Sequence, residues 1–236
     1  MRILIERIIG KLKGDPLYRM DEDYSARQLI SILYIRFCQV LRGYVLKLRV
    51  SSSGVIFCGR RVVVRFGYQI TAGKSLILED GVHLEALSSS GIILGNHVTI
   101  AKHAILSCTG VIANKGVGIQ IGNNSAVGAQ SFLGGQGGIV IGNDVIMGPQ
   151  VKMFSENHNY ASQVERIRLQ GVSRKGITIG DNCWIGAGTT ILDGVAISQG
   201  CVIAAGSVVT KSIPENSIAR GIPAVVVGTR SLNAKQ

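Results

Sequence analysis

An aliphatic side chain returns at every sixth position along much of this chain. The clearest series comprises Ile179, Ile185, Ile191, Ile197, Ile203 and Val209. Four positions after these residues comes a second series of small or apolar residues, namely Cys183, Thr189, Val195, Cys201 and Ser207. A period of six fits neither a single amphipathic helix nor the two-residue alternation of a plain strand. The pattern instead predicts short parallel strands joined by corners, with both series pointing inward.

The same register occurs upstream, with interruptions. Shorter series begin at Leu94, Ile121 and Ile141, a short insertion falls in LGGQGGIV, and a long break runs from 159 to 176. Three strands of this kind close a triangular coil of about 18 residues, and successive coils stack at strand spacing, about 4.8 Å. Each coil buries its aliphatic side chains only by stacking on the next. We therefore predict a mainly β protein, a parallel β-helix over 55–228, between an N-terminal helical segment (1–54) and a tail (229–236).

Residues 25–49 have a helical period instead. On a helical wheel, one face collects the apolar residues Ile30, Leu33, Phe37, Val40, Leu41, Tyr44 and Leu48. Asp21, Glu22 and Asp23 precede this stretch, as suits a helix N-terminus, and it contains only basic charges. Two interpretations stay open: the helix covers an end of the β-helix or an oligomer contact, or it lies on an anionic membrane surface.

The amino-acid composition limits the classes of ligand and partner that the protein is expected to bind. The formal net charge is +11, which favours anionic ligands or surfaces. The sequence has no zinc-finger spacing and few aromatic residues, so we expect no nucleic-acid partner. Five scattered cysteines without a C-x-x-C pair favour a reducing cytoplasm and argue against a zinc cluster. We also expect neither a signal peptide nor a transmembrane helix, and hence a cytoplasmic protein, peripheral at the inner face of the membrane if the helix binds there.

His158 is the first candidate for chemistry. It lies in MFSENHNY, where the six-residue register gives way to the break. This position predicts an imidazole at the edge of the prism and not inside it. Because an imidazole titrates near neutral pH, His158 could accept a proton there. The spacing of His83, His97 and His103 does not stack them into a ligand set, so we predict no metal site.

Three segments in order, IVIGNDVIMGPQVKMFSENH, WIGAGTTILDGV and GSVVTKSIPENSIARGIPA, resemble the hexapeptide-repeat acetyltransferases of the galactoside and maltose type. The resemblance implies a left-handed β-helix, although general crossover preferences favour the right-handed form. It also implies that His158 is a general base in direct acyl transfer, that acetyl-CoA is the donor, and that the protein is a homotrimer with its CoA sites between subunits.

The same resemblance assigns the donor and acceptor residues. It places Ala187 and Ala205 in the CoA groove, with Trp184 at its border and Thr210 and Lys211 at the nucleotide end. Ala187 and Ala205 are separated in sequence by one predicted coil, so they are also expected to stack, although small residues suit any repeat corner. On the acceptor side we expect Gln136 and Asn157.

The chain also departs from those enzymes. Gly128 and Gln136 stand where galactoside acetyltransferases have an asparagine and an aspartate that bind the acceptor, so we expect a different sugar. The GIPA motif leads into VVVG, without the basic residue that often follows it. The N-terminal segment is also unlike the short helical segment of those enzymes.

The sequence thus predicts an acetyl-CoA-dependent O-acetyltransferase acting on a saccharide hydroxyl, in particular a precursor of a surface polysaccharide. Two alternatives remain at this point. One is an N-acetyltransferase of a nucleotide-linked amino sugar, which the same base would serve. The other is a β-helical scaffold without catalytic activity.

Overall fold

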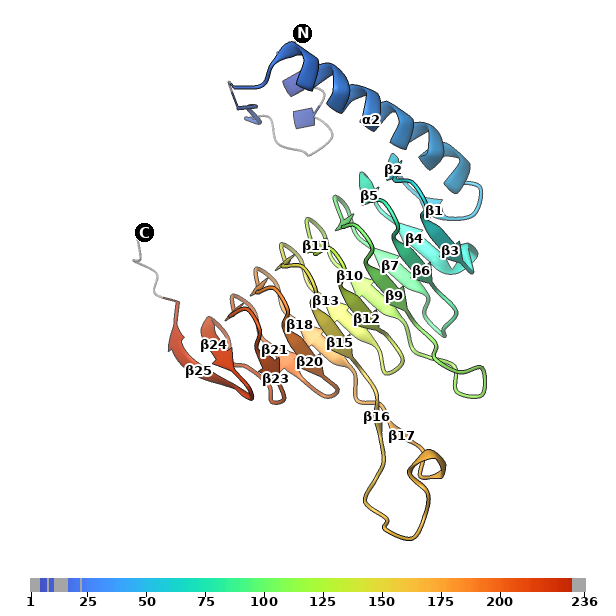
Figure 1. The fold of residues 1–236 in the computed structure, drawn as a ribbon, viewed down its shortest axis with the longest axis vertical. Helices are drawn as coiled ribbons and strands as arrows, with labels where there is room; N and C mark the ends of the chain where they lie inside the picture. The colour runs from blue at the N-terminus through green and yellow to red at the C-terminus, as the bar shows by residue number, and fades with distance from the viewer. Residues whose placement is uncertain (1–4, 8, 11–16, 22, 231–236) are drawn as a thin grey trace.

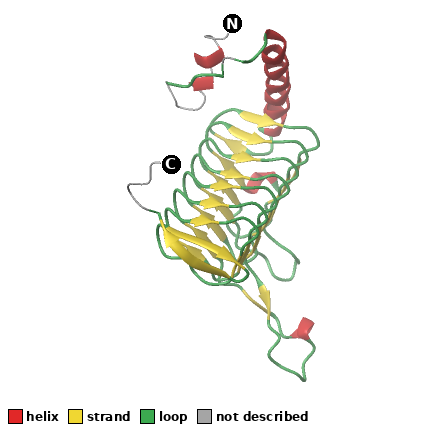
Figure 2. Ribbon diagram, turned by 60° about the vertical axis from the view of Figure 1, so that its left-hand side comes forward, coloured by secondary structure: helices red, strands yellow, loops and turns green. Residues whose placement is uncertain are grey.

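Three short parallel β-sheets wind around one apolar core in the computed structural model (Figure 1), which describes residues 5–7, 9–10, 17–21 and 23–230. Each complete coil contributes one parallel strand to each sheet, the last strand of the second sheet runs antiparallel to its neighbour, and an α-helix stands at the N-terminal end of the stack (Figure 2). The fold is the predicted left-handed parallel β-helix with an N-terminal helix. Of the expected tail, residues 231–236 lie outside the described residues, as does Glu22 before the helix.

The strands of each sheet follow one another in spatial order. The first sheet contains β1 (Ser51–Ser52), β4 (Ile70–Ala72), β7 (Ile92–Leu94), β10 (Ile119–Ile121), β13 (Ile139–Ile141), β18 (Ile177–Ile179) and β21 (Ala196–Ile197). The second contains β2 (Ile56–Cys58), β5 (Leu76–Leu78), β8 (Thr99–Ile100), β11 (Ala126–Val127), β14 (Ile146–Met147), β19 (Trp184–Ile185), β22 (Val202–Ile203), β24 (Ser217–Gly221) and β25 (Ala224–Thr229). The third contains β3 (Val63–Arg65), β6 (His83–Glu85), β9 (Ile105–Ser107), β12 (Phe132–Gly134), β15 (Lys152–Phe154), β20 (Thr190–Leu192) and β23 (Val208–Val209). The coils therefore begin at residue 51, slightly before the expected boundary at 55.

Both hexad series point into the core, as predicted. Every member of the series from Ile179 to Val209 is buried, and so is every member of the series from Cys183 to Ser207. Stacking these side chains from coil to coil removes them from water, which is the main favourable contribution to folding. The sequence pattern and the packing therefore agree residue by residue in this region.

Most coils are longer than the hexad pattern predicts. Thr178 pairs with Ala196, the expected step of 18, but Ile119 pairs with Ile139, a step of 20, and Ile92 with Ile119, a step of 27. The extra residues form bends and loops at the corners and leave the strands in register. Corner positions such as Asn124 adopt a left-handed backbone, with φ of 55°, which Asn tolerates better than most residues.

The predicted break between 159 and 176 is an arm that projects from the coils (Figure 1). Its base is a two-stranded antiparallel ladder of β16 (Asn157–His158) and β17 (Val172–Ser173). The short 3-10 helix η2 (Ile167–Leu169) lies farther out, and a second such helix, η1 (Gly67–Gln69), precedes β4. The Gln170 side chain bonds to the backbone of Ser162 and Glu165, so it gives the arm internal structure.

The helix α2 (Ala26–Leu46) begins at Ser25, whose side chain forms a capping box with Gln28. Its C-terminal half packs on β2 through Gln39, Gly43 and Leu46. The helix therefore covers the first coil, as one of the two interpretations expects. The apolar face expected to make such a contact does not make it: apart from half-buried Val40, its members are exposed.

Candidate active site

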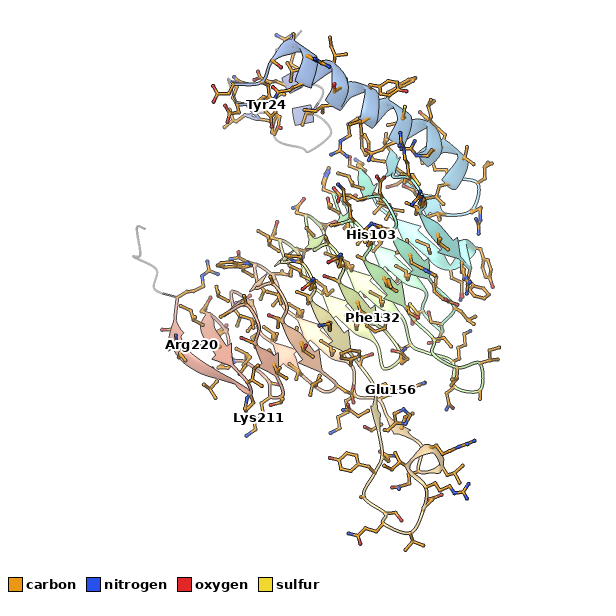
Figure 3. The ribbon with its side chains drawn as sticks, viewed as in Figure 1. Tyr24, His103, Phe132, Glu156, Lys211 and Arg220 are labelled. Carbon is orange, nitrogen blue, oxygen red and sulfur yellow. The ribbon has the colours of Figure 1, made fainter. Side chains whose placement is uncertain are left out.

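The C-terminal ends of β12, β15, β20 and β23 lie side by side at one edge of the third sheet, because parallel strands all end at the same edge. We call this edge the arm edge, since the arm leaves from it after β15. The residues that follow these strands include Gln136, Asn157, His158, Thr210 and Lys211. The structure thus brings five of the predicted site residues to a single edge, and Figure 3 shows Glu156 and Lys211 on the same side of the stack.

His158 is exposed at the base of the arm, as the sequence predicts. Its backbone is held by the ladder with β17, in which His158 pairs with Val172. Within the described residues, its imidazole forms no hydrogen bond or ion pair with the protein. The ring is therefore free to meet a ligand while its backbone is fixed.

A half-buried ion pair fixes the arm beside His158. The Arg174 guanidinium lies 2.6 Å from the Glu156 carboxylate. It also donates to the carbonyl oxygens of Lys115 and Asn114, in the loop between β9 and β10. Arg174 thus ties both limbs of the arm and a neighbouring loop together, next to the ladder that holds His158.

Gln136 lies one strand spacing from Glu156, because β12 pairs with β15 and Gly134 opposes Phe154. The buried hydroxyl of Ser155 donates to the Gly134 carbonyl at 2.6 Å and accepts from the Gly137 N–H at 2.8 Å. The Ser155 hydroxyl therefore joins the bend that contains Gln136 to the residue that follows β15. Gln136 and Asn157 thus follow two neighbouring strands at the arm edge.

Thr210 and Lys211 lie two strand spacings from the end of β15, since β20 stands between β15 and β23. Two spacings correspond to about 10 Å. Both side chains are exposed. The Lys211 ammonium is therefore available to an anionic group on the same edge as His158.

Trp184, Ala187 and Ala205 lie elsewhere. They belong to the corner between the second and third sheets, at the strand starts of the third sheet. The two alanines stack as predicted, because the Gly206 N–H donates to the Ala187 carbonyl at 2.8 Å. The extended chain from Ala205 to Thr210 spans about 15 Å. One chain therefore holds the predicted donor residues on two edges of one sheet, and only Thr210 and Lys211 share the edge of His158.

The corner of Ala187 and Ala205 is open on its outer side. A Cβ placed on Gly206 would meet nothing within 4 Å. Within the described part of the chain, the N–H groups of Ala187 and Ala205 have no hydrogen-bond acceptor. This corner therefore offers two backbone donors to a narrow polar chain. Trp184, which is 56% exposed on β19, borders it.

Comparison with known proteins agrees with this architecture. Residues 176–211 match the family described as hexapeptide repeat of succinyl-transferase. Over these residues the chain carries the hexapeptide repeat of that family. The chain is 40% identical over 88 residues to galactoside O-acetyltransferase of Lactococcus lactis. The matched segment covers 37% of this chain and 42% of that relative. The predicted resemblance to the sugar acetyltransferases is thereby confirmed.

Two further similarities complete the comparison. The hexapeptide-repeat protein is 33% identical over 112 residues to the putative colanic acid biosynthesis acetyltransferase WcaF of Escherichia coli, covering 48% of this chain and 59% of that one. The crystal structure of AntD, an N-acyltransferase from Bacillus cereus, superposes with a TM-score of 0.54 at 16% identity, covering 80% of this chain and 89% of that one. The chain spans about half the length of the curated relatives it matches.

Sequence reasoning missed Glu156 and Arg174 as partners in this hexapeptide-repeat protein. The pairing joins the two ends of the break, where the hexad pattern gives no register. One signal was present: a lone acidic residue beside His158 and a basic residue at the far end of the break.

Metal ligation has no support in the described part of the hexapeptide-repeat protein, where no group of three His, Cys, Asp or Glu side chains could hold an ion. His83 stands beside Glu85, with 3.9 Å between its Nε2 atom and the carboxylate. Arg65 contacts the same carboxylate at 3.6 Å. This cluster lies on the third sheet, four strands from β20, and is separate from the arm edge.

Proposed function

We propose that this chain transfers an acetyl group from acetyl-CoA to a saccharide hydroxyl, with His158 as the general base. The observation that carries the proposal is the exposed, backbone-fixed His158 on the same edge as Lys211. The similarity to galactoside O-acetyltransferase over the matched segment supports the same reaction. The similarity to WcaF supports a surface-polysaccharide precursor as the acceptor.

The chemistry requires little beyond a base and a polarised thioester. Acetyl-CoA supplies the activated acetyl group. His158 removes the proton of the acceptor hydroxyl while that oxygen bonds to the acetyl carbon. The C–S bond then breaks, and the imidazolium returns its proton to the leaving sulfur. Gln136 and Asn157, which lie on the same edge as His158, would orient the acceptor.

The residues present fit a CoA molecule. Lys211 offers a positive charge for phosphate, and the open corner of Ala187 and Ala205 offers two N–H donors for the amides of a pantetheine chain. These features occupy opposite edges of one sheet, so a single chain does not surround the donor. We therefore propose a homotrimer in which His158 of one subunit faces the alanine corner of the next.

Acetyl transfer can be tested directly by mass spectrometry. The purified chain is incubated with acetyl-CoA and a panel of neutral, acidic and nucleotide-linked sugars, and CoA release is followed in parallel. The account predicts a mass gain of one acetyl group that hydroxylamine removes, as it does from an ester. An amide product would resist hydroxylamine and indicate N-acetylation, and absence of CoA binding by calorimetry would indicate a scaffold.

A further inference from the structure

The side of α2 that faces away from the coils is apolar, and no described residue of the chain covers it. Its exposed fractions range from 40% at Leu33 to 86% at Leu48. We define the outer face of α2 as the exposed residues Ile30, Leu33, Tyr34, Phe37, Leu41, Tyr44, Val45 and Leu48. Contiguous exposed apolar surface of this kind marks an interaction site more often than not.

Helix geometry places the outer face opposite the contact with the coils. Successive residues of an α-helix rotate by about 100°, so Phe37 and Leu48 lie on the side opposite Gln39. Gln39 and Gly43 face β2, and Arg42 donates to the carbonyl oxygens of Cys58 and Gly59. The outer face therefore lies on the side of α2 opposite its contact with β2.

The charged residues of α2 and of the segment that follows it are all basic. Between Tyr24 and Leu78 the sequence holds nine Lys and Arg residues and no Asp or Glu. Among the described residues, no cation of α2 forms an ion pair. The nearest carboxylates after the helix, Glu79 and Asp80, line the cavity beneath it on the coil side. They accept hydrogen bonds from the backbone there.

The length of α2 alone would also suit a membrane span. It has 21 residues, about 31 Å at 1.5 Å per residue, and includes an 18-residue window with a mean hydropathy of 1.4. Its inner side, however, carries Arg36 and Arg42, and Arg42 is bonded to the first coil. A helix whose C-terminal half packs on the first coil cannot be surrounded by lipid along its whole length. The asymmetry of α2 fits a helix that lies in the interface of a bilayer.

We propose that the outer face of α2 docks on the surface of an anionic lipid bilayer. The apolar side chains enter the boundary between headgroups and acyl chains, and the surrounding Lys and Arg residues contact lipid phosphates. A second copy of the chain is the other candidate occupant, but it would bring the same positive charge to the contact and be repelled. The bilayer surface alone is complementary in both polarity and charge.

Docking through α2 also sets the distance between the arm edge and the bilayer. β15 stands four strands from β3 in the third sheet, which is about 20 Å at strand spacing. An acceptor presented from the bilayer on a lipid carrier would meet His158 at that distance from the first coil. The docking surface itself does not depend on the proposed acetyl transfer.

Co-sedimentation with vesicles tests the proposal. The full chain is mixed with vesicles of phosphatidylcholine alone or with added phosphatidylglycerol, at low and high salt. We expect binding to the anionic vesicles, weakened by salt. The variant Phe37→Ser/Leu41→Ser/Leu48→Ser should lose that binding. Arg27→Gln/Lys47→Gln should lower the affinity for anionic vesicles roughly tenfold, because each basic residue near an anionic surface contributes to attraction.

The matched control removes three apolar side chains elsewhere that are at least as exposed on average, as Ile112→Ser/Val164→Ser/Val225→Ser, and should bind as the parent does. Circular dichroism establishes that each variant keeps its fold. Equal binding of the Phe37 triple variant and the parent would overturn the proposal. So would a parent that ignores anionic vesicles, or an oligomer that dissociates only when the outer face is changed, since a second copy would then be the occupant.

Discussion

Cys183 and Cys201 show how the core treats a reactive side chain. Both thiols are buried one coil apart and hydrogen bond to carbonyl oxygens of Ser198 and Pro214. Both cysteines are free. Burial raises the pKa of each thiol above its ordinary value, because a thiolate would lose its hydration there. The core therefore holds these two cysteines as buried free thiols in successive coils.

This burial predicts slow alkylation. Because the thiol pKa is raised, the reactive thiolate is scarce at mildly alkaline pH and becomes common only as the pH rises toward the raised value. Cys108, whose pKa is raised to about 12 by burial, should behave in the same way. Iodoacetamide at mildly alkaline pH, followed by mass spectrometry, should leave these three unmodified in the native protein and modify them after unfolding. Fast native modification of Cys201 would mean that the coil opens there.

The contact between α2 and the first coil depends on the absence of a side chain at Gly43. A Cβ at this position would lie 1.7 Å from the Ile56 carbonyl oxygen, closer than any non-bonded contact allows. Gly is otherwise unfavourable in a helix, by about 1 kcal/mol relative to Ala. Packing therefore outweighs helix propensity at Gly43.

Gly43→Ala should accordingly destabilise the protein, although the substitution improves helix propensity. We expect a lower midpoint of thermal unfolding by calorimetry, or a separate early transition in which α2 detaches. Ser31→Ala, on an exposed turn of the same helix, is the control and should change stability by no more than about 0.5 kcal/mol. A midpoint that rises with Gly43→Ala would show that α2 is not seated on β2.

The arm is the element that positions His158, and the Glu156–Arg174 ion pair is its clamp. If the arm loosens, the imidazole loses its fixed place while the donor-binding residues stay as they are. Arg174→Ala should therefore lower kcat by about tenfold or more and leave the affinity for CoA unchanged. Arg174→Lys, which keeps the charge, should recover part of kcat.

Steady-state kinetics on these two variants, with limited proteolysis of the arm, separates positioning from folding. A loss of CoA affinity equal to the loss of kcat would mean general destabilisation and contradict the clamp. Equal kcat for parent and Arg174→Ala would also contradict it.

The sequence predicted the coils because their physics is local and periodic. Each hexad points the same two positions into the core, so the inward orientation of Ile185 and Ile203 follows from their spacing alone. The packing face of α2 could not be predicted from the helical pattern. It depends on hydrogen bonds from Arg42 to backbone carbonyl groups of the first coil. The Glu156–Arg174 pair escaped for a related reason: the arm interrupts the repeat and has its own antiparallel register.

At the scale of the whole molecule, the division of the candidate site between two sheet edges predicts a shared active centre. Two inactive variants, His158→Ala and Ala205→Trp, should then complement each other when unfolded together and refolded. Random assembly of a cyclic trimer from equal amounts gives about a quarter of the parental sites. Activity of the mixture no greater than that of the separate variants would place each site within one chain.

The account depends most directly on the role of His158 as the general base. The rate of acetyl transfer by the His158→Ala variant tests that role. We predict that kcat falls by about a hundredfold or more, while calorimetry finds the parental affinity for CoA and the oligomer keeps its size. Transfer at the parental rate, or a loss of transfer that merely follows a loss of CoA binding, would contradict the account.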